Sequence, residues 1–201
     1  MRIIKMNPDD PDPTLLNEAI NILSDGGIII YPTDTLYGLG ANIYNKKAIR
    51  NIYNIKGRDK NKPMSVCVSS IEVISLIANI PSEYKNLIMN NLPGPFTFIL
   101  SKNSSIPYYF MTNNGKIGIR VPKSEIARKL SHIFPITATS ANLSGKEALR
   151  TPKEIANQLN VDVDLVIDVG PLGSNSPSTV VDLTTKEIKI LRQGSGHLSH
   201  V

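Results

Sequence analysis

Four cationic side chains occupy alternate positions in the stretch KGRDKNKP, which spans residues 56–63. They are Lys56, Arg58, Lys60 and Lys62. Three uses of this charge are open: a solvated face, where alternation puts every charge on one side, a patch for nucleic acid, or a clamp for a small phosphate ligand. The first is the usual explanation of a charge run, and the rest of the chain must decide.

Two further stretches place small polar side chains beside apolar runs. YPTDTLYGLG (31–40) contains two threonines, Asp34 and two glycines, which suits either a ligand-lined turn or an ordinary exit from a strand. An isolated aspartate such as Asp34 is most often a turn or cap residue. TATSANLSG (137–145) places Ser140 and Asn142 on the same side of an extended chain, where both could bond phosphate oxygens or sugar hydroxyls. The pattern alone favours a turn in which they bond local backbone groups.

Two arginines lie in or beside apolar runs. IGIRVP (117–122) contains Arg120, and ILRQGSG (190–196) has Arg192 where a strand should end. An unpaired guanidinium is costly to bury, so Arg120 should meet an anion, either a carboxylate of the protein or one of a substrate. Two arginines in this setting favour a ligand site.

Nucleophilic and metal chemistry have weak support. Cys67 stands between two valines and is predicted to be a small buried hydrophobe, and no serine lies in a G-x-S-x-G elbow. The three histidines lack metal-ligand spacing, and neither a Walker A loop nor a complete dinucleotide fingerprint is present. Cations, hydroxyls and carboxamides predominate, which is equipment for positioning phosphates rather than for attack by a side chain.

The elements that must position these residues alternate between helix and strand. Helices are predicted over 12–25, 45–56, 124–133 and 151–160, and strands follow them at 28–32, 63–68, 135–139 and 164–169. Asp12 and Thr151 are expected helix caps, and Glu154 completes a capping box with Thr151. Two β-rich runs at 178–184 and 187–194 predict an antiparallel hairpin. The fold class is therefore α/β, a twisted sheet of mixed parallel and antiparallel strands with helices on its faces.

Length and composition set the outer limits. The chain has 201 residues, is 41% hydrophobic and carries 22 Lys+Arg against 17 Asp+Glu, a net charge of +5. We expect one domain over residues 1–201. The apolar runs are too short to span a bilayer and the polar start has no signal-peptide core, so a cytoplasmic protein without membrane contact is expected.

Seven stretches taken together resemble the YrdC-like family, the L-threonylcarbamoyladenylate synthases of the single-domain type. They are YPTDTLYGLG, KGRDKNKP, PGPFTFIL, IGIRVP, TSANLSG, STVVDL and LRQG, and their order covers nearly the whole chain. The resemblance implies condensation of L-threonine, bicarbonate and ATP, with Mg²⁺ accompanying ATP, to threonylcarbamoyl-AMP and pyrophosphate. It further implies a concave positive cavity, and a partner transferase that makes N6-threonylcarbamoyladenosine at position 37 of tRNA.

The resemblance also assigns site residues. For ATP it implies Lys56, Arg58, Lys62, Ser140, Asn142 and Arg192. For threonine it implies Thr35, Cys67, Arg120, Ala138 and Ser178, with Arg120 facing the carboxylate. Some relatives have histidine at the position of Cys67, and relatives vary at Lys62. On this interpretation Lys56 and Arg58 are phosphate ligands, while Lys60 is solvated.

Two other functions compete with the synthase. One is a module that binds double-stranded RNA or tRNA without nucleotide turnover, although only 5% of residues are aromatic and the interleaved aromatics of single-strand readers are not visible. The other is carbamoyl transfer, because a YrdC-like domain occurs in hydrogenase-maturation carbamoyltransferases, which are much longer chains. Whether tRNA contacts this chain directly stays open.

Overall fold

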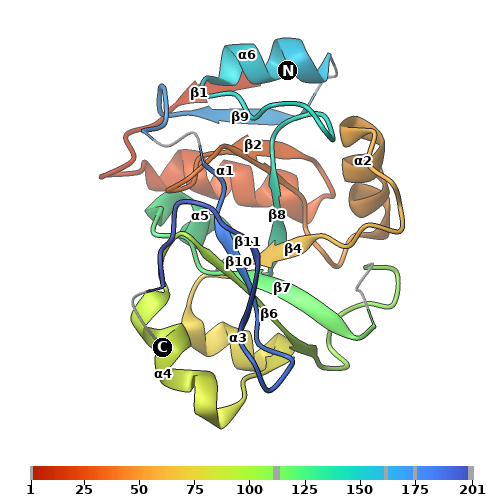
Figure 1. Cartoon of the computed structure of the whole chain (residues 1–201). Coiled ribbons are helices and arrows are strands. Elements are labelled where there is room, and N and C mark those ends of the chain that lie inside the picture. The colour runs from red at the N-terminus through yellow and green to blue at the C-terminus, as the bar shows by residue number, and fades with distance from the viewer. Residues whose placement is uncertain (1, 111–113, 161–162, 174–175, 199–201) are drawn as a thin grey trace.

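The strands join into one twisted sheet that runs through the molecule (Figure 1). The computed structural model describes residues 2–110, 114–160, 163–173 and 176–198. Across the sheet the order is β1 (Arg2–Lys5), β9 (Leu165–Asp168), β2 (Ile29–Tyr31), β3 (Gly38–Gly40), β8 (Ile136–Ser140), β4 (Ser65–Cys67), β7 (Lys116–Arg120), β6 (Phe96–Lys102), β10 (Thr179–Asp182) and β11 (Lys189–Arg192). The short β5 (Ala78–Asn79) pairs with β6 beside this path. Neighbours in the sheet are often distant in the chain, so it brings remote motifs together.

Parallel and antiparallel pairs are mixed along the sheet. Strand β9 is parallel to both β1 and β2, whereas β3 and β8 are antiparallel to both of their neighbours. Strand β10 is parallel to β6 and forms an antiparallel pair with β11. The predicted mixed sheet and the predicted hairpin are both confirmed.

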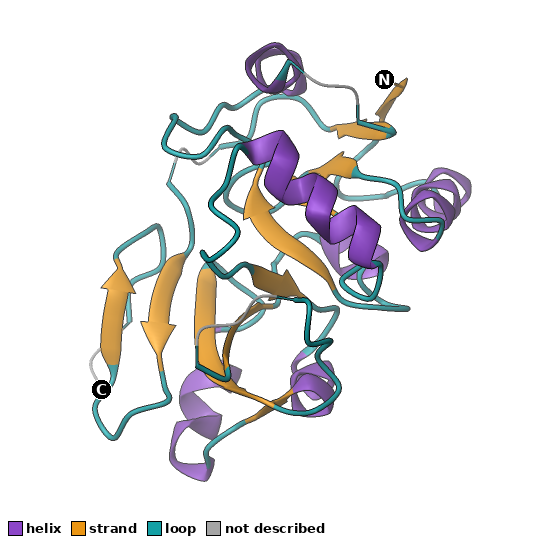
Figure 2. Cartoon of the chain, turned by 90° about the vertical axis from the view of Figure 1, so that its right-hand side faces the viewer, coloured by secondary structure: helices purple, strands orange, loops and turns teal. Residues whose placement is uncertain are grey.

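Helices lie on both sides of the strands (Figure 2). They are α1 (Pro13–Ser24), α2 (Lys46–Lys56), α3 (Ile71–Ile77), the 3₁₀ turn η1 (Ser82–Tyr84), α4 (Lys85–Asn91), α5 (Glu125–Leu130) and α6 (Pro152–Leu159). Local capping explains where several begin: Asp12 accepts from two amides of α1, and Thr151 forms the predicted capping box with Glu154. None of the helices in the described part of the chain is long and apolar enough to cross a membrane.

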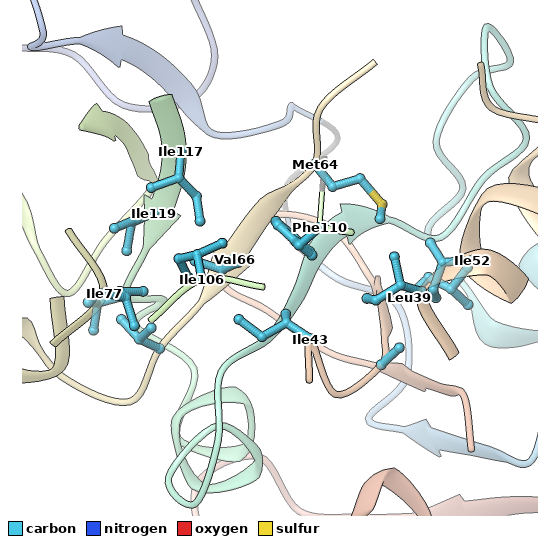
Figure 3. Close-up of a cluster of buried hydrophobic side chains, with 14 of the residues drawn as sticks. Leu39, Ile43, Ile52, Met64, Val66, Ile77, Ile106, Phe110, Ile117 and Ile119 are labelled. Carbon is cyan, nitrogen blue, oxygen red and sulfur yellow. The ribbon is translucent and has the colours of Figure 1, made fainter. Parts of the chain in front are cut away.

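The hydrophobic core fills both faces of the sheet. Ile29 and Tyr31 of β2 pack in one cluster with residues of α1 and α5, while Ile30 packs in a second cluster with residues of α2 and α6. Figure 3 shows part of the second cluster, where Val66 and Ile119 lie on adjacent strands. Strand β2 is therefore covered on both faces, as its continuous apolar run predicts.

One buried hydroxyl ties together the strands that carry two of the polar motifs. Thr137 on β8 is fully buried. Its Oγ1 donates to the carbonyl of Leu39 at 2.7 Å and accepts from the amide of Ala41 at 3.0 Å. The bonds fix β8 against β3, so the turns that follow these strands keep a defined separation.

Thr137→Val is expected to lower the free energy of unfolding by about 2 kcal/mol. The shape is preserved, but the Leu39 carbonyl and the Ala41 amide lose a partner away from water. Urea denaturation measures the change. Thr137→Ser is the matched control, because it keeps the hydroxyl and loses only a methyl group, at a cost of about 1 kcal/mol. A valine variant as stable as the serine variant would contradict this account.

Candidate functional site

A cavity of about 510 Å³ opens where the polar motifs converge. This volume lies within the range of small-molecule sites, roughly 300–1,000 Å³. Its lining includes every residue that the sequence assigned to a ligand: Thr35, Lys56, Arg58, Lys62, Cys67, Arg120, Ala138, Ser140, Asn142, Ser178 and Arg192. Residues from the two halves of the chain thus share one concave surface, and their contact with a nucleotide or an amino acid stays a prediction.

The cavity is strongly positive. Five cationic side chains line it, namely Lys56, Arg58, Lys62, Arg120 and Arg192, against one carboxylate, Asp59. Hydroxyl groups of threonines and serines make up much of the remaining polar lining. Such a surface concentrates anions, and a polyanionic ligand suits it better than a neutral one.

Lys56 is the most constrained of these cations. It is the last residue of α2, is 2% exposed, and Gly57 follows in a left-handed conformation that ends the helix. The ammonium donates to the carbonyls of Ser140 at 2.5 Å and Asn142 at 2.7 Å, and lies 3.4 Å from Oδ1 of Asn142. Burial, and then the charge of Arg58, lowers the pKa of Lys56 to about 8. Because three acceptors match its three donors, Lys56 anchors the turn at 140–142.

The rest of the basic stretch forms a turn rather than a charged face. Arg58 folds back and its Nη2 donates to the carbonyl of Pro63 at 2.8 Å. Lys60 and Lys62 are exposed, but only Lys62 lines the cavity. The idea that alternation puts all four charges on one side is wrong, since Lys56 points inward from a helix.

The turn after β8 is organised by its own side chains. Ser140 donates its hydroxyl to Oδ1 of Asn142, and Nδ2 of Asn142 donates to the carbonyls of Leu143 and Lys146 at 3.0 and 2.7 Å. The local-turn interpretation of this motif is confirmed. Both the oxygen and the nitrogen of the Asn142 carboxamide are occupied by these bonds. A nucleotide here would therefore contact the backbone of the turn rather than the Asn142 side chain.

Arg120 holds the opposite end of the cavity. It is 8% exposed; its Nη2 pairs with Asp34 at 2.6 Å and its Nη1 donates to Thr35 Oγ1 at 2.7 Å. The anion required by the buried guanidinium is thus supplied by the protein, and Asp34 is more than a turn residue. Arg120 Nε is buried and has no hydrogen-bond partner among the described residues.

A hydroxyl network completes this end. Ser178 Oγ lies 2.8 Å from Thr97 Oγ1, and Arg192 donates to the Ser178 carbonyl at 2.8 Å. Burial, and then the charge of Arg120, lowers the pKa of Arg192. Thr97 was missed by sequence reasoning because it stands in the apolar run PGPFTFIL, where nothing local distinguishes it from a core threonine.

Cys67, Ala138 and Tyr31 line the cavity and belong to one hydrophobic cluster. Cys67 is buried, as predicted, and burial raises the pKa of its thiol to about 11, so it stays a neutral thiol. Tyr31, which sequence reasoning treated only as a strand residue, lines the cavity and donates to the Thr137 carbonyl at 2.9 Å. The sequence did contain a signal for Tyr31, because a polar phenol at the end of a buried apolar strand needs a hydrogen-bond partner.

Comparison with protein families and solved structures gives consistent matches. The family model Sua5_yciO_yrdC, described as telomere recombination, matches residues 21–194. The chain belongs to this YrdC-like family. A Methanocaldococcus jannaschii protein, provisionally named as a threonylcarbamoyl-AMP synthase, is 41% identical over 96% of this chain and 92% of its own.

Two solved members of the YrdC-like family extend the comparison. Escherichia coli YciO, whose curated name gives no activity, is 34% identical, with a TM-score of 0.91 and 98% of both chains covered. Pyrococcus abyssi Sua5, complexed with L-threonine, is 31% identical with a TM-score of 0.90. The match covers 96% of this chain but 58% of that protein, so this chain spans little more than half of Sua5.

Lys56→Met is expected to loosen the turn at 140–142. Methionine keeps a long stem but leaves the Ser140 and Asn142 carbonyls without their donor, so amides of this turn should exchange about tenfold faster. Hydrogen–deuterium exchange of a peptide spanning residues 139–146 provides the measurement. Lys62→Met is the matched control, because that ammonium makes no hydrogen bond to the described residues. Equal exchange in both variants would show that Lys56 does not anchor the turn.

Proposed function

We propose that this chain is an L-threonylcarbamoyladenylate synthase. The reaction joins L-threonine, bicarbonate and ATP to give threonylcarbamoyl-AMP, pyrophosphate and water. One observation carries the proposal: residues from seven separate motifs converge on a single cavity with five cations, one carboxylate and many hydroxyls. The similarity to named synthases in M. jannaschii and P. abyssi supports the same reaction.

The threonine subsite is proposed at the Arg120 end. A substrate carboxylate there would accept from guanidinium N–H groups beyond those that bond Asp34 and Thr35, a charged fork that a neutral side chain could not provide. Thr35 and Asp34 hold the guanidinium in place, and Ser178 offers a hydroxyl nearby in the lining. Cys67 and Ala138, which also line the cavity, would contact a small apolar group such as the methyl of threonine. That P. abyssi Sua5 was crystallised with L-threonine is consistent with this subsite.

The nucleotide subsite is proposed at the Lys56 end. Arg58 and Lys62 can reach phosphate oxygens with donors that no described residue uses, and Arg192, from the Arg120 end, would face the other side of the nucleotide. Lys56 adds its positive charge to this end of the cavity, and its hydrogen bond to the Ser140 carbonyl orients the turn at 140–142. On this proposal Arg58, Lys62 and Arg192 bind phosphate, whereas Lys56 positions the turn at 140–142.

Magnesium is proposed to enter with ATP. Among the described residues, no three His, Cys, Asp or Glu side chains come together as a cation site. Mg²⁺ usually keeps several waters and binds substrate phosphates with one or two carboxylates, and Asp59 is the carboxylate at this rim. When bound, the ion would neutralise charge that grows on the phosphates.

The chemistry itself needs orientation more than side-chain attack. The threonine amine forms a C–N bond with CO2 derived from bicarbonate, which gives a carbamate and releases the elements of water. A carbamate oxygen then bonds to the α-phosphorus as the bond to pyrophosphate breaks. Cations around the phosphates stabilise the pyrophosphate leaving group, and the cavity holds the reactants in line. A transferase that carries the threonylcarbamoyl group to tRNA would consume the product.

Pyrophosphate release is expected only when threonine, bicarbonate and MgATP are all present. Reactions that lack one component at a time, followed by a coupled phosphate assay and mass analysis of the adenylate, test the proposal. Release without threonine would indicate ordinary ATP hydrolysis, and no release together with tight binding of duplex RNA would favour the RNA-binding alternative.

Arg120→Gln is expected to reduce kcat/KM for threonine at least a hundredfold while the KM for ATP changes little. The glutamine cannot pair with a carboxylate through a charged fork, and it leaves Asp34 unpaired. The double variant Arg120→Gln with Asp34→Asn removes the unpaired charge and serves as the control for folding. Equal losses for threonine and ATP in a folded double variant would remove Arg120 from the threonine subsite.

A further inference from the structure

An exposed aromatic patch lies outside the cavity, at the start of α2. It consists of Tyr44, Tyr108, Tyr109 and Lys46, and none of these residues lines the cavity. The side chain of Tyr108 is 84% exposed and that of Tyr44 is 44% exposed. These two are the aromatic members of the large hydrophobic residues that are exposed in the described part of the chain. Exposed aromatic surface gathered in one place calls for an explanation.

Ring contacts and hydrogen bonds hold the side chains of this patch in place. The rings of Tyr108 and Tyr109 meet edge to face, with centroids 5.5 Å apart and an interplanar angle of 78°. The Lys46 ammonium lies 5.4 Å from the Tyr108 ring centroid and donates to its hydroxyl at 3.2 Å. Tyr109 donates its hydroxyl to the Tyr44 carbonyl, which ties Tyr109 to the segment just before α2. The Tyr108 ring is therefore held in position with most of its surface in water.

The charged side chains of α2, the helix whose Lys46 contacts this ring, are all positive. The exposed cations Lys46, Lys47 and Arg50 stand on α2, and α2 contains no acidic residue. Two lysines in a first turn do not serve helix stability, because the helix dipole disfavours cations there. The combination of a fixed, exposed aromatic ring and adjacent cations that form no ion pair with the described residues matches the stacking platforms that bind single-stranded nucleic acid.

We propose that this surface binds an unpaired nucleotide of a single-stranded nucleic acid, with a base stacked on Tyr108 and phosphates beside Lys46 and Lys47. The inference does not depend on the synthase reaction. A protein partner fits less well, since such interfaces are depleted in lysine at their cores. The sequence hid this feature because 62 residues separate Lys46 from Tyr108, so aromatics and cations interleave only in the fold.

Fluorescence anisotropy with labelled oligoadenylate of about twelve nucleotides tests the proposal. Stacking predicts that Tyr108→Ala weakens binding about tenfold, whereas Tyr108→Phe, which keeps the ring, stays within about twofold of the parent. Tyr108→Leu should resemble alanine, because it is apolar but has no planar face. Lys46→Ala and Lys47→Ala should each reduce the slope of log K against log salt by about 0.7.

Controls distinguish binding at this surface from non-specific electrostatic attraction of the oligonucleotide to the positively charged protein. Lys153→Ala removes an exposed cation from α6 and should leave binding unchanged. RNA and DNA oligonucleotides of the same sequence identify the source, because tighter RNA binding would assign a contact to the 2′-hydroxyl. Any one of three results would overturn the proposal: a blunt duplex that binds as tightly as the single strand, a Tyr108→Ala variant that binds like the parent, or a Tyr108→Leu variant that retains binding.

Discussion

The cavity depends on one buried ammonium. The side chain of Lys56 bonds to the carbonyls of Ser140 and Asn142, and the carbonyl of the same residue accepts from the amide of Ser144 at 2.8 Å. The end of α2 is thereby locked to a turn more than eighty residues later in the chain. Both walls of the proposed nucleotide subsite follow from this lock, because α2 leads into the basic turn and β8 leads into the serine turn.

Repulsion among like charges is the second constraint on the site. Five cations share a cavity of about 510 Å³, and the pKa values of Lys56 and Arg192 are both lowered, first by burial and then by an arginine nearby. The protein compensates largely with carbonyl oxygens, which accept from Lys56, Arg58 and Arg192. Carbonyl dipoles hold the cations in place without cancelling their charge, so the cavity stays attractive to a polyanion.

Local signals were sufficient for much of the fold. Caps, apolar periodicity and the hairpin spacing predicted α1, α2, α5, α6 and the pair β10–β11, since each depends on residues close in sequence. The helices α3 and α4 escaped notice because each has only seven residues and no side-chain cap. The family resemblance selected residues that share one cavity, but the sequence did not predict the hydrogen-bond partners of these residues. Those partners are backbone carbonyls, which have no sequence signature, or a carboxylate 86 residues away, as with Asp34 and Arg120.

The periodicity of α2 explains how one helix serves two surfaces. Its buried face contains Ile49, Ile52 and Tyr53, and Lys56 comes seven residues after Ile49, where the apolar stripe would continue. The same rotation turns Lys46 and Arg50 outward. The ends of the helix are about 15 Å apart at 1.5 Å per residue, so the inward Lys56 and the outward Lys46 belong to separate surfaces. A lysine in the position of a core residue was thus the sequence signal for Lys56: its charge had to find oxygen acceptors inside the fold, which separates it from its solvated neighbour Lys60.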